Sequence, residues 1–96
     1  MEKSRLKVLA ETGIMSRPAT RLVMAAQEYT SDVTLTYNDR TVNLKSIMGV
    51  MSLGIPQDSY IEIEINGDDE KEAMAGIEDY LQKEGIVEKV TMDADA

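Results

Sequence analysis

Ser46 is the residue whose type and position best suit regulated chemistry. It follows an apparent strand and directly precedes a short apolar segment, so its hydroxyl is a candidate helix N-cap. A phosphate on this hydroxyl would meet unpaired N–H groups and the positive end of the helix dipole, beside Lys45. Most serines in such a place only cap a helix, so the residues alone leave two interpretations open, a structural cap and a phosphorylation site.

The composition excludes most enzyme chemistry. The 96-residue chain has no histidine and no cysteine, which removes the usual general base of neutral pH, thiol nucleophiles, disulfides and the common zinc sites. The carboxylates at 68–72 are explained by the preference of acidic residues for a helix N-terminus, and they lack the ligand order of a calcium loop. We therefore expect no enzyme, no cofactor and no metal site.

The net charge of −8 is unevenly distributed along the chain. Residues 1–50 hold seven Lys and Arg against five Asp and Glu, whereas residues 51–96 hold three against thirteen. The acidic total argues against direct nucleic-acid binding, while the first half could receive an acidic partner or an anionic group. With no apolar run near 20 residues and no signal peptide in view, we expect a cytoplasmic protein without membrane contact.

Alternating apolar residues predict the strands that position Ser46. Asn38 and Asp39 are a turn signal and predict a hairpin between two of these strands. The predicted strands are 4–10, 32–37, 41–44 and 60–66.

Helical spacing predicts three helices: about 16–28 with Ser16 as N-cap, 47–53, and about 69–84. The order β-α-β-β-α-β-α predicts an α+β open-faced sandwich, in which three helices cover a four-stranded antiparallel sheet. The domain would span residues 1–85. Residues 86–96 carry no strong pattern and would form a flexible C-terminal tail.

An exposed apolar surface is predicted beside Ser46. The short helix that follows it carries Ile47, Met48 and Met51 and is apolar nearly all round, so some of these side chains must face outward. Methionine adapts to irregular partner surfaces, which is typical of a docking patch, although plain core packing explains the same residues. The predicted outer face of the 16–28 helix carries Arg17, Thr20, Arg21 and Met24.

Two motifs resemble those of the HPr family, the phosphocarrier proteins of the bacterial sugar phosphotransferase system. Residues 12–20 (TGIMSRPAT) are similar to its active-site signature, and residues 43–55 to its regulatory serine segment. In the first motif Met15 occupies the position of the histidine that takes a phosphoryl group from enzyme I and passes it to sugar permease subunits. A thioether lacks the basic lone pair for this step, so the resemblance implies a protein that is not competent for the relay.

The second motif keeps its serine. The resemblance implies that HPr kinase/phosphorylase phosphorylates Ser46, and that the phosphoserine form then acts as corepressor of catabolite control protein A in carbon catabolite repression. It further implies that kinase and repressor meet one face of the protein. The residues of this face would be Arg17, Thr20, Arg21, Met24, Lys45, Ile47, Met48 and Met51.

Loss of the histidine with retention of the serine is similar to the family member catabolite repression HPr (Crh). Crh usually has glutamine where this chain has Met15, so the pattern fits both a Crh and a separately altered HPr. Some Crh proteins form strand-swapped dimers, and the strand at 4–10 with the Thr12-Gly13 hinge allows either a monomer or such a homodimer.

Two further functions stay open. The fold could dock on phosphotransferase-system or metabolic enzymes through its Met-rich face without phosphorylation. Alternatively, phosphotransfer could proceed through Thr12 or Ser16, which is the weakest interpretation because hydroxyl groups form stable phosphate esters.

Overall fold

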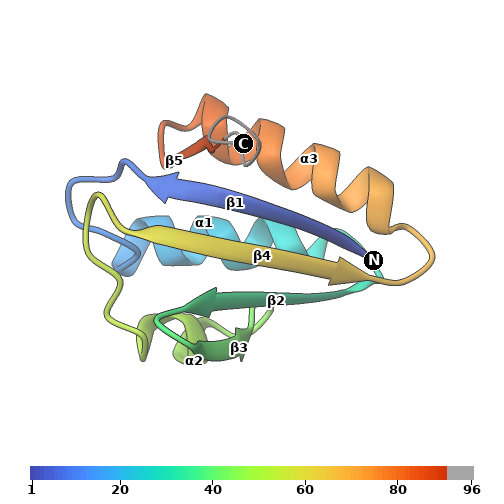
Figure 1. The fold of residues 1–96 in the computed structure, drawn as a ribbon, viewed down its shortest axis with the longest axis horizontal. Coiled ribbons are helices and arrows are strands. Elements are labelled where there is room, and N and C mark those ends of the chain that lie inside the picture. The colour runs from blue at the N-terminus through green and yellow to red at the C-terminus, as the bar shows by residue number, and fades with distance from the viewer. Residues whose placement is uncertain (91–96) are drawn as a thin grey trace, which may run out of the picture.

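One antiparallel sheet forms a layer of the molecule, and three helices cover one of its faces (Figure 1). The computed structural model describes residues 1–90. The strands are β1 (Glu2–Val8), β2 (Asp32–Tyr37), β3 (Arg40–Asn43), β4 (Tyr60–Asn66) and β5 (Val87–Lys89). The helices are α1 (Ser16–Gln27), α2 (Ile47–Met51) and α3 (Glu70–Lys83). The predicted α+β open-faced sandwich is confirmed.

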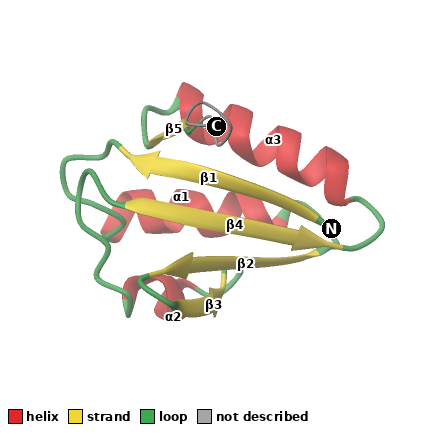
Figure 2. Cartoon of the chain, viewed as in Figure 1, coloured by secondary structure: helices red, strands yellow, loops and turns green. Residues whose placement is uncertain are grey.

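The sheet has the strand order β3-β2-β4-β1-β5, and every pairing is antiparallel (Figure 2). Period-two alternation explains its two faces, because Ile61, Ile63 and Ile65 are buried toward the helices while the residues between them face the other side. On that open face, the guanidinium of Arg5 lies over the ring of Tyr60 at 5.2 Å. The apolar core therefore lies between the sheet and the helices.

The β2–β3 hairpin is closed by Asn38 and Asp39, which both adopt positive φ angles of 52° and 65°. A two-residue turn with two left-handed residues matches the right-handed twist of the flanking strands, and Asn and Asp tolerate this conformation better than most residues. The hairpin predicted from these two residues is confirmed. Its returning strand, β3, leads through residues 44 and 45 directly to Ser46.

A fifth strand corrects the sequence prediction. β5 pairs with β1, with Val87 opposite Val8, and both Ile86 and Val87 are buried. Gly85, with φ of +71°, ends α3 and lets the chain return to the sheet. Three residues are too few for alternation to show in the sequence, so the sheet has five strands where four were predicted. The remainder of the predicted tail, residues 91–96, lies outside the described residues.

The start of α1 also differs from its prediction. Met15 occupies the N-cap position and gives no side-chain cap, while Ser16 is the first helical residue and has a positive φ of 49°. Thr20 donates its hydroxyl hydrogen to the Ser16 carbonyl at 3.0 Å. The predicted Ser16 cap was therefore wrong by one residue. Met15, and not Ser16, therefore occupies the N-cap position, and both residues are exposed.

The carboxylate of Asp69 anchors the start of α3. It accepts hydrogen bonds from the backbone N–H groups of Thr30 and Ser31, both at 2.9 Å, and from the Ser31 hydroxyl. The Ser31 hydroxyl first, and then the backbone donors, lower the pKa of Asp69 to about 2. This cluster joins the loop after α1 to the beginning of α3. Asp69 therefore has a structural role, which is to tether this loop and not to cap the helix with its side chain.

Candidate functional site

Ser46 caps α2 as its sequence position predicts. The residue has extended backbone angles of −110° and 115°, and its Oγ accepts a hydrogen bond from the Gly49 N–H at 3.2 Å. A turn fixes its approach from β3, because the Ser46 N–H donates to the Asn43 carbonyl at 3.0 Å. Ser46 is only half-buried. The hydroxyl is thus held at the start of α2 by a hydrogen bond, in a residue that is partly exposed.

The helix that follows Ser46 divides its apolar residues between core and surface. Val50 is fully buried, and Met51 packs in part against the core. Met48 is 82% exposed and Ile47 is 38% exposed. α2 therefore presents two large apolar side chains to solvent immediately after the serine, while Met51 has mainly a packing role.

Lys45 contacts the C-terminal end of α1 and the loop that follows it. Its ammonium group donates to the Tyr29 carbonyl at 2.8 Å, and its own carbonyl accepts from Gln27 Nε2 at 3.3 Å. A lysine beside the carbonyl groups at the end of α1 also favours the helix dipole. These contacts join the Ser46 turn to the C-terminal end of α1.

The first motif lies at the opposite end of α1. Met15 is 38% exposed, and the neighbouring Arg17 is exposed and forms no ion pair within residues 1–90. Arg21 is paired with Glu84, the residue that follows α3. A pocket beside this ion pair is lined by Ala10, Arg17, Pro18, Arg21, Glu84, Gly85 and Ile86. No hydrogen bond or ion pair in the described part of the chain joins either arginine to Ser46.

Thr20 and Met24 complete the predicted outer face of α1. Thr20 is half-buried, and its hydroxyl is used within the helix, whereas Met24 is 59% exposed. α1 packs against both α2 and α3. The packing of α1 against α2 brings the helix that carries Arg17, Thr20, Arg21 and Met24 beside the helix that carries Ile47, Met48 and Met51.

Gly13 lies in contact with the segment that follows α2 and so joins the two motifs. The sequence indicated only that Gly13 ends the first strand pattern. Gly13 has φ of +73°, and a Cβ on it would lie 2.1 Å from the Ile55 carbonyl oxygen. That oxygen accepts the Ile14 N–H at 2.9 Å. The segment before Met15 thus rests directly on the segment after α2. Glu84, the partner of Arg21, was likewise not identified, because nothing in the local sequence pairs the two.

Within residues 1–90, no three acidic side chains are grouped so that they could hold a metal ion. In the same range, none of the helices has the length and apolar character needed to cross a membrane.

Comparison with known proteins identifies the family. The family model for the PTS HPr component phosphorylation site matches residues 2–83. The chain is 34% identical to HPr from Thermoanaerobacter tengcongensis, with a TM-score of 0.82 over 86% of this chain and 93% of that protein. It is 29% identical to the histidine-containing phosphocarrier protein of Mycoplasma, with a TM-score of 0.85 over 90% of this chain and 98% of that protein.

Crh, the catabolite repression HPr of Bacillus subtilis, is also similar. Its crystal structure, a dimer with a swapped domain, matches with 39% identity and a TM-score of 0.67 over 80% of this chain and 88% of Crh. The family match spans both motifs, yet the chain contains no histidine and has Met15 at the start of α1. The chain therefore belongs to the HPr family and is a Crh-like member of it.

Proposed function

We propose that this protein is a non-enzymatic, cytoplasmic regulator of carbon catabolite repression that is switched by phosphorylation of Ser46. HPr kinase/phosphorylase would add the phosphate, and the modified protein would act as corepressor of catabolite control protein A. The observation that carries the proposal is the position of Ser46. This partly exposed serine directly precedes an exposed apolar pair, Ile47 and Met48, in a chain that has no histidine to phosphorylate.

A phosphate on Ser46 would change the surface without disturbing the core. It would add roughly 1.5 to 2 negative charges at pH 7, and its oxygens could accept the Gly49 N–H that the hydroxyl accepts now. Lys45 is the adjacent residue, and its ammonium could leave the Tyr29 carbonyl for the phosphate. The buried side of α2, at Val50, faces away from this change. The product would be a combined anionic and apolar surface that exists only after modification.

Met15 supports the regulatory part of the proposal. A histidine relay needs a nitrogen lone pair that is basic near neutral pH, which a thioether does not have. Thr12 and Ser16 are exposed, but a phosphate ester on a hydroxyl is too stable to be passed on readily. Phosphorylation would therefore be a regulatory modification of this protein, which would not pass the phosphoryl group on.

A second candidate function is docking without phosphorylation. Met24, Ile47 and Met48 are exposed whether or not Ser46 is modified, and exposed methionines suit irregular partner surfaces. The partner would then be a phosphotransferase-system or metabolic enzyme. Either function is compatible with a monomer or with a homodimer that exchanges β1. Dimeric structures exist for HPr from Thermoanaerobacter tengcongensis and for Crh.

Incubation with a cognate HPr kinase and ATP tests the modification. We expect the intact mass to rise by one phosphate, and we expect Ser46→Ala to remain unmodified. Ser52→Ala is the matched control, because Ser52 lies at the other end of α2 and donates its hydroxyl hydrogen to the Gly49 carbonyl at 2.6 Å. An unmodified wild-type protein, or a phosphate that persists in Ser46→Ala, would overturn the proposal.

A further inference from the structure

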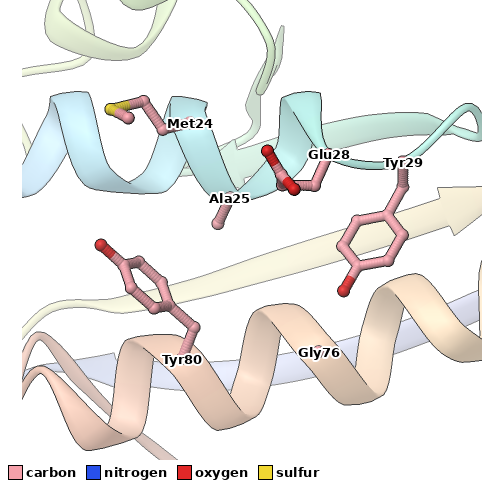
Figure 3. A pocket seen from close by; sticks show the side chains of 6 residues that line it. All are labelled: Met24, Ala25, Glu28, Tyr29, Gly76 and Tyr80. Carbon is pink, nitrogen blue, oxygen red and sulfur yellow. The ribbon is translucent and has the colours of Figure 1, made fainter.

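A pocket of about 320 Å³ lies between α1 and α3, and no residue of α2 lines it. Its size falls at the lower end of the range for small-molecule sites. Met24 at its edge is 59% exposed and Tyr80 is 37% exposed, so large apolar groups are presented to solvent here. The lining residues are Met24, Ala25, Glu28, Tyr29, Gly76 and Tyr80 (Figure 3).

Gly76 allows the aromatic walls of this pocket to form. A Cβ at residue 76 would lie 1.9 Å from the Tyr29 hydroxyl oxygen, so a side chain there would displace the ring. Figure 3 shows Tyr29 reaching from the end of α1 toward α3, while Tyr80 reaches from α3 back toward α1. The ring of Tyr29, from the loop that follows α1, and the ring of Tyr80, from α3, thus lie on either side of Ala25 (Figure 3).

Glu28 is the one charged side chain that lines the pocket within residues 1–90, and the Lys45 ammonium lies next to this lining, where it donates to the Tyr29 carbonyl at 2.8 Å. Glu28 is exposed at its edge and takes part in no ion pair within residues 1–90. No lysine or arginine lines the pocket, and the chain as a whole carries a net charge of −8. Tyrosine rings attract cations through the negative face of their π-system, and a nearby carboxylate adds to this attraction. An anionic ligand would find no positively charged side chain among the lining residues.

We propose that this pocket binds small organic ammonium compounds, in which a quaternary or protonated amine is carried on a short apolar stem. The ammonium group would lie against the rings of Tyr29 and Tyr80, close to the Glu28 carboxylate. The stem would contact Met24 and Ala25. A single carboxylate beside apolar walls suits a weakly hydrated organic cation better than a metal ion, which requires several oxygen ligands.

A titration with choline tests this site, with the side-chain methyl resonances of the methionines as the readout. We expect a saturable shift of the Met24 resonance, while the exposed Met48 resonance stays in place. The neutral carbon isostere of choline, in which a tert-butyl group replaces the trimethylammonium, should bind at least about fivefold more weakly. Equal binding of the two compounds, parallel shifts of Met24 and Met48, or no shift at all would overturn the proposal.

Three variants locate the site. Glu28→Gln keeps the shape of an exposed side chain and should weaken choline binding several-fold, by about the factor that separates choline from its isostere. Tyr80→Ala should remove the saturable shift. Tyr60→Ala, on the open face of the sheet, is the matched aromatic control and should bind as the wild type does. If Glu28→Gln binds choline as tightly as the wild type, the pocket is only an apolar hollow and the proposal fails.

Discussion

Met15→His is expected to turn a protein that accepts no phosphoryl group from enzyme I into one that does. The side chain at this position is 38% exposed at the N-cap of α1, so the substitution does not disturb the core. An imidazole would supply the missing basic nitrogen near neutral pH. The backbone N–H groups of the first turn and the guanidinium of Arg17, which is exposed and forms no ion pair within residues 1–90, could then stabilise a bound phosphoryl group.

Labelled phosphoenolpyruvate with enzyme I measures this effect. The wild type should take up no label, whereas Met15→His should take up one acid-labile phosphoryl group per chain. Met24→His is the control, because it places an imidazole at another exposed methionine of the same helix and should stay unlabelled. Label on the wild-type protein would show that Thr12 or Ser16 acts instead. A folded Met15→His that stays unlabelled would show that more than the histidine has been lost from the site.

Met48→Asp is expected to remove most of the affinity of the phosphorylated protein for catabolite control protein A. Met48 is the most exposed large apolar side chain in the described part of the chain, at 82%. A buried apolar anchor at an interface contributes about 2 kcal/mol or more, which corresponds to a loss of roughly 30-fold in affinity. A carboxylate there would also have to be desolvated beside the phosphate on Ser46. Because Met48 contributes little to the core, the free energy of unfolding should change by only about 0.5 kcal/mol.

Two variants distinguish the loss of the apolar Met48 contact from a nonspecific effect of added negative charge. Met48→Leu keeps an apolar side chain and should retain most of the affinity. Tyr60→Asp adds the same negative charge on the open face of the sheet, where Tyr60 is 49% exposed, and should bind as the wild type does. The docking face would be misassigned if Met48→Asp bound normally, or if Tyr60→Asp weakened binding equally.

Local patterns predicted most of the fold. The alternation of Ile61, Ile63 and Ile65 identified the central strand, and Asn38 with Asp39 identified the hairpin, because each signal depends only on neighbours in the chain. β5 was missed because its pairing with β1 is long-range and its three residues show no period. The cap of α1 was misplaced because Ser16 adopts a left-handed conformation that its residue type does not indicate.

The candidate site was predicted less completely than the fold. The cap at Ser46 followed from its position, whereas the apolar residues all round the next helix required only that some of them face outward, without identifying Met48 as the most exposed. The partners of the long charged side chains could not be predicted from the sequence. Lys45 donates to the Tyr29 carbonyl and Arg21 pairs with Glu84, and only the folded chain brings these residues together. The pocket between α1 and α3 was also missed. It depends on Gly76 facing Tyr29, two residues that are distant in the sequence.

The proposed switch is tested by the affinity of catabolite control protein A for the same chain with and without phosphate on Ser46. The kinase-treated wild type should bind at least about tenfold more tightly than the untreated protein, since the phosphate can add charge-assisted hydrogen bonds across the interface. Kinase-treated Ser46→Ala should bind only as the untreated protein does. Equal affinity of the phosphorylated and unphosphorylated wild type would contradict the account and favour a docking module that needs no phosphate.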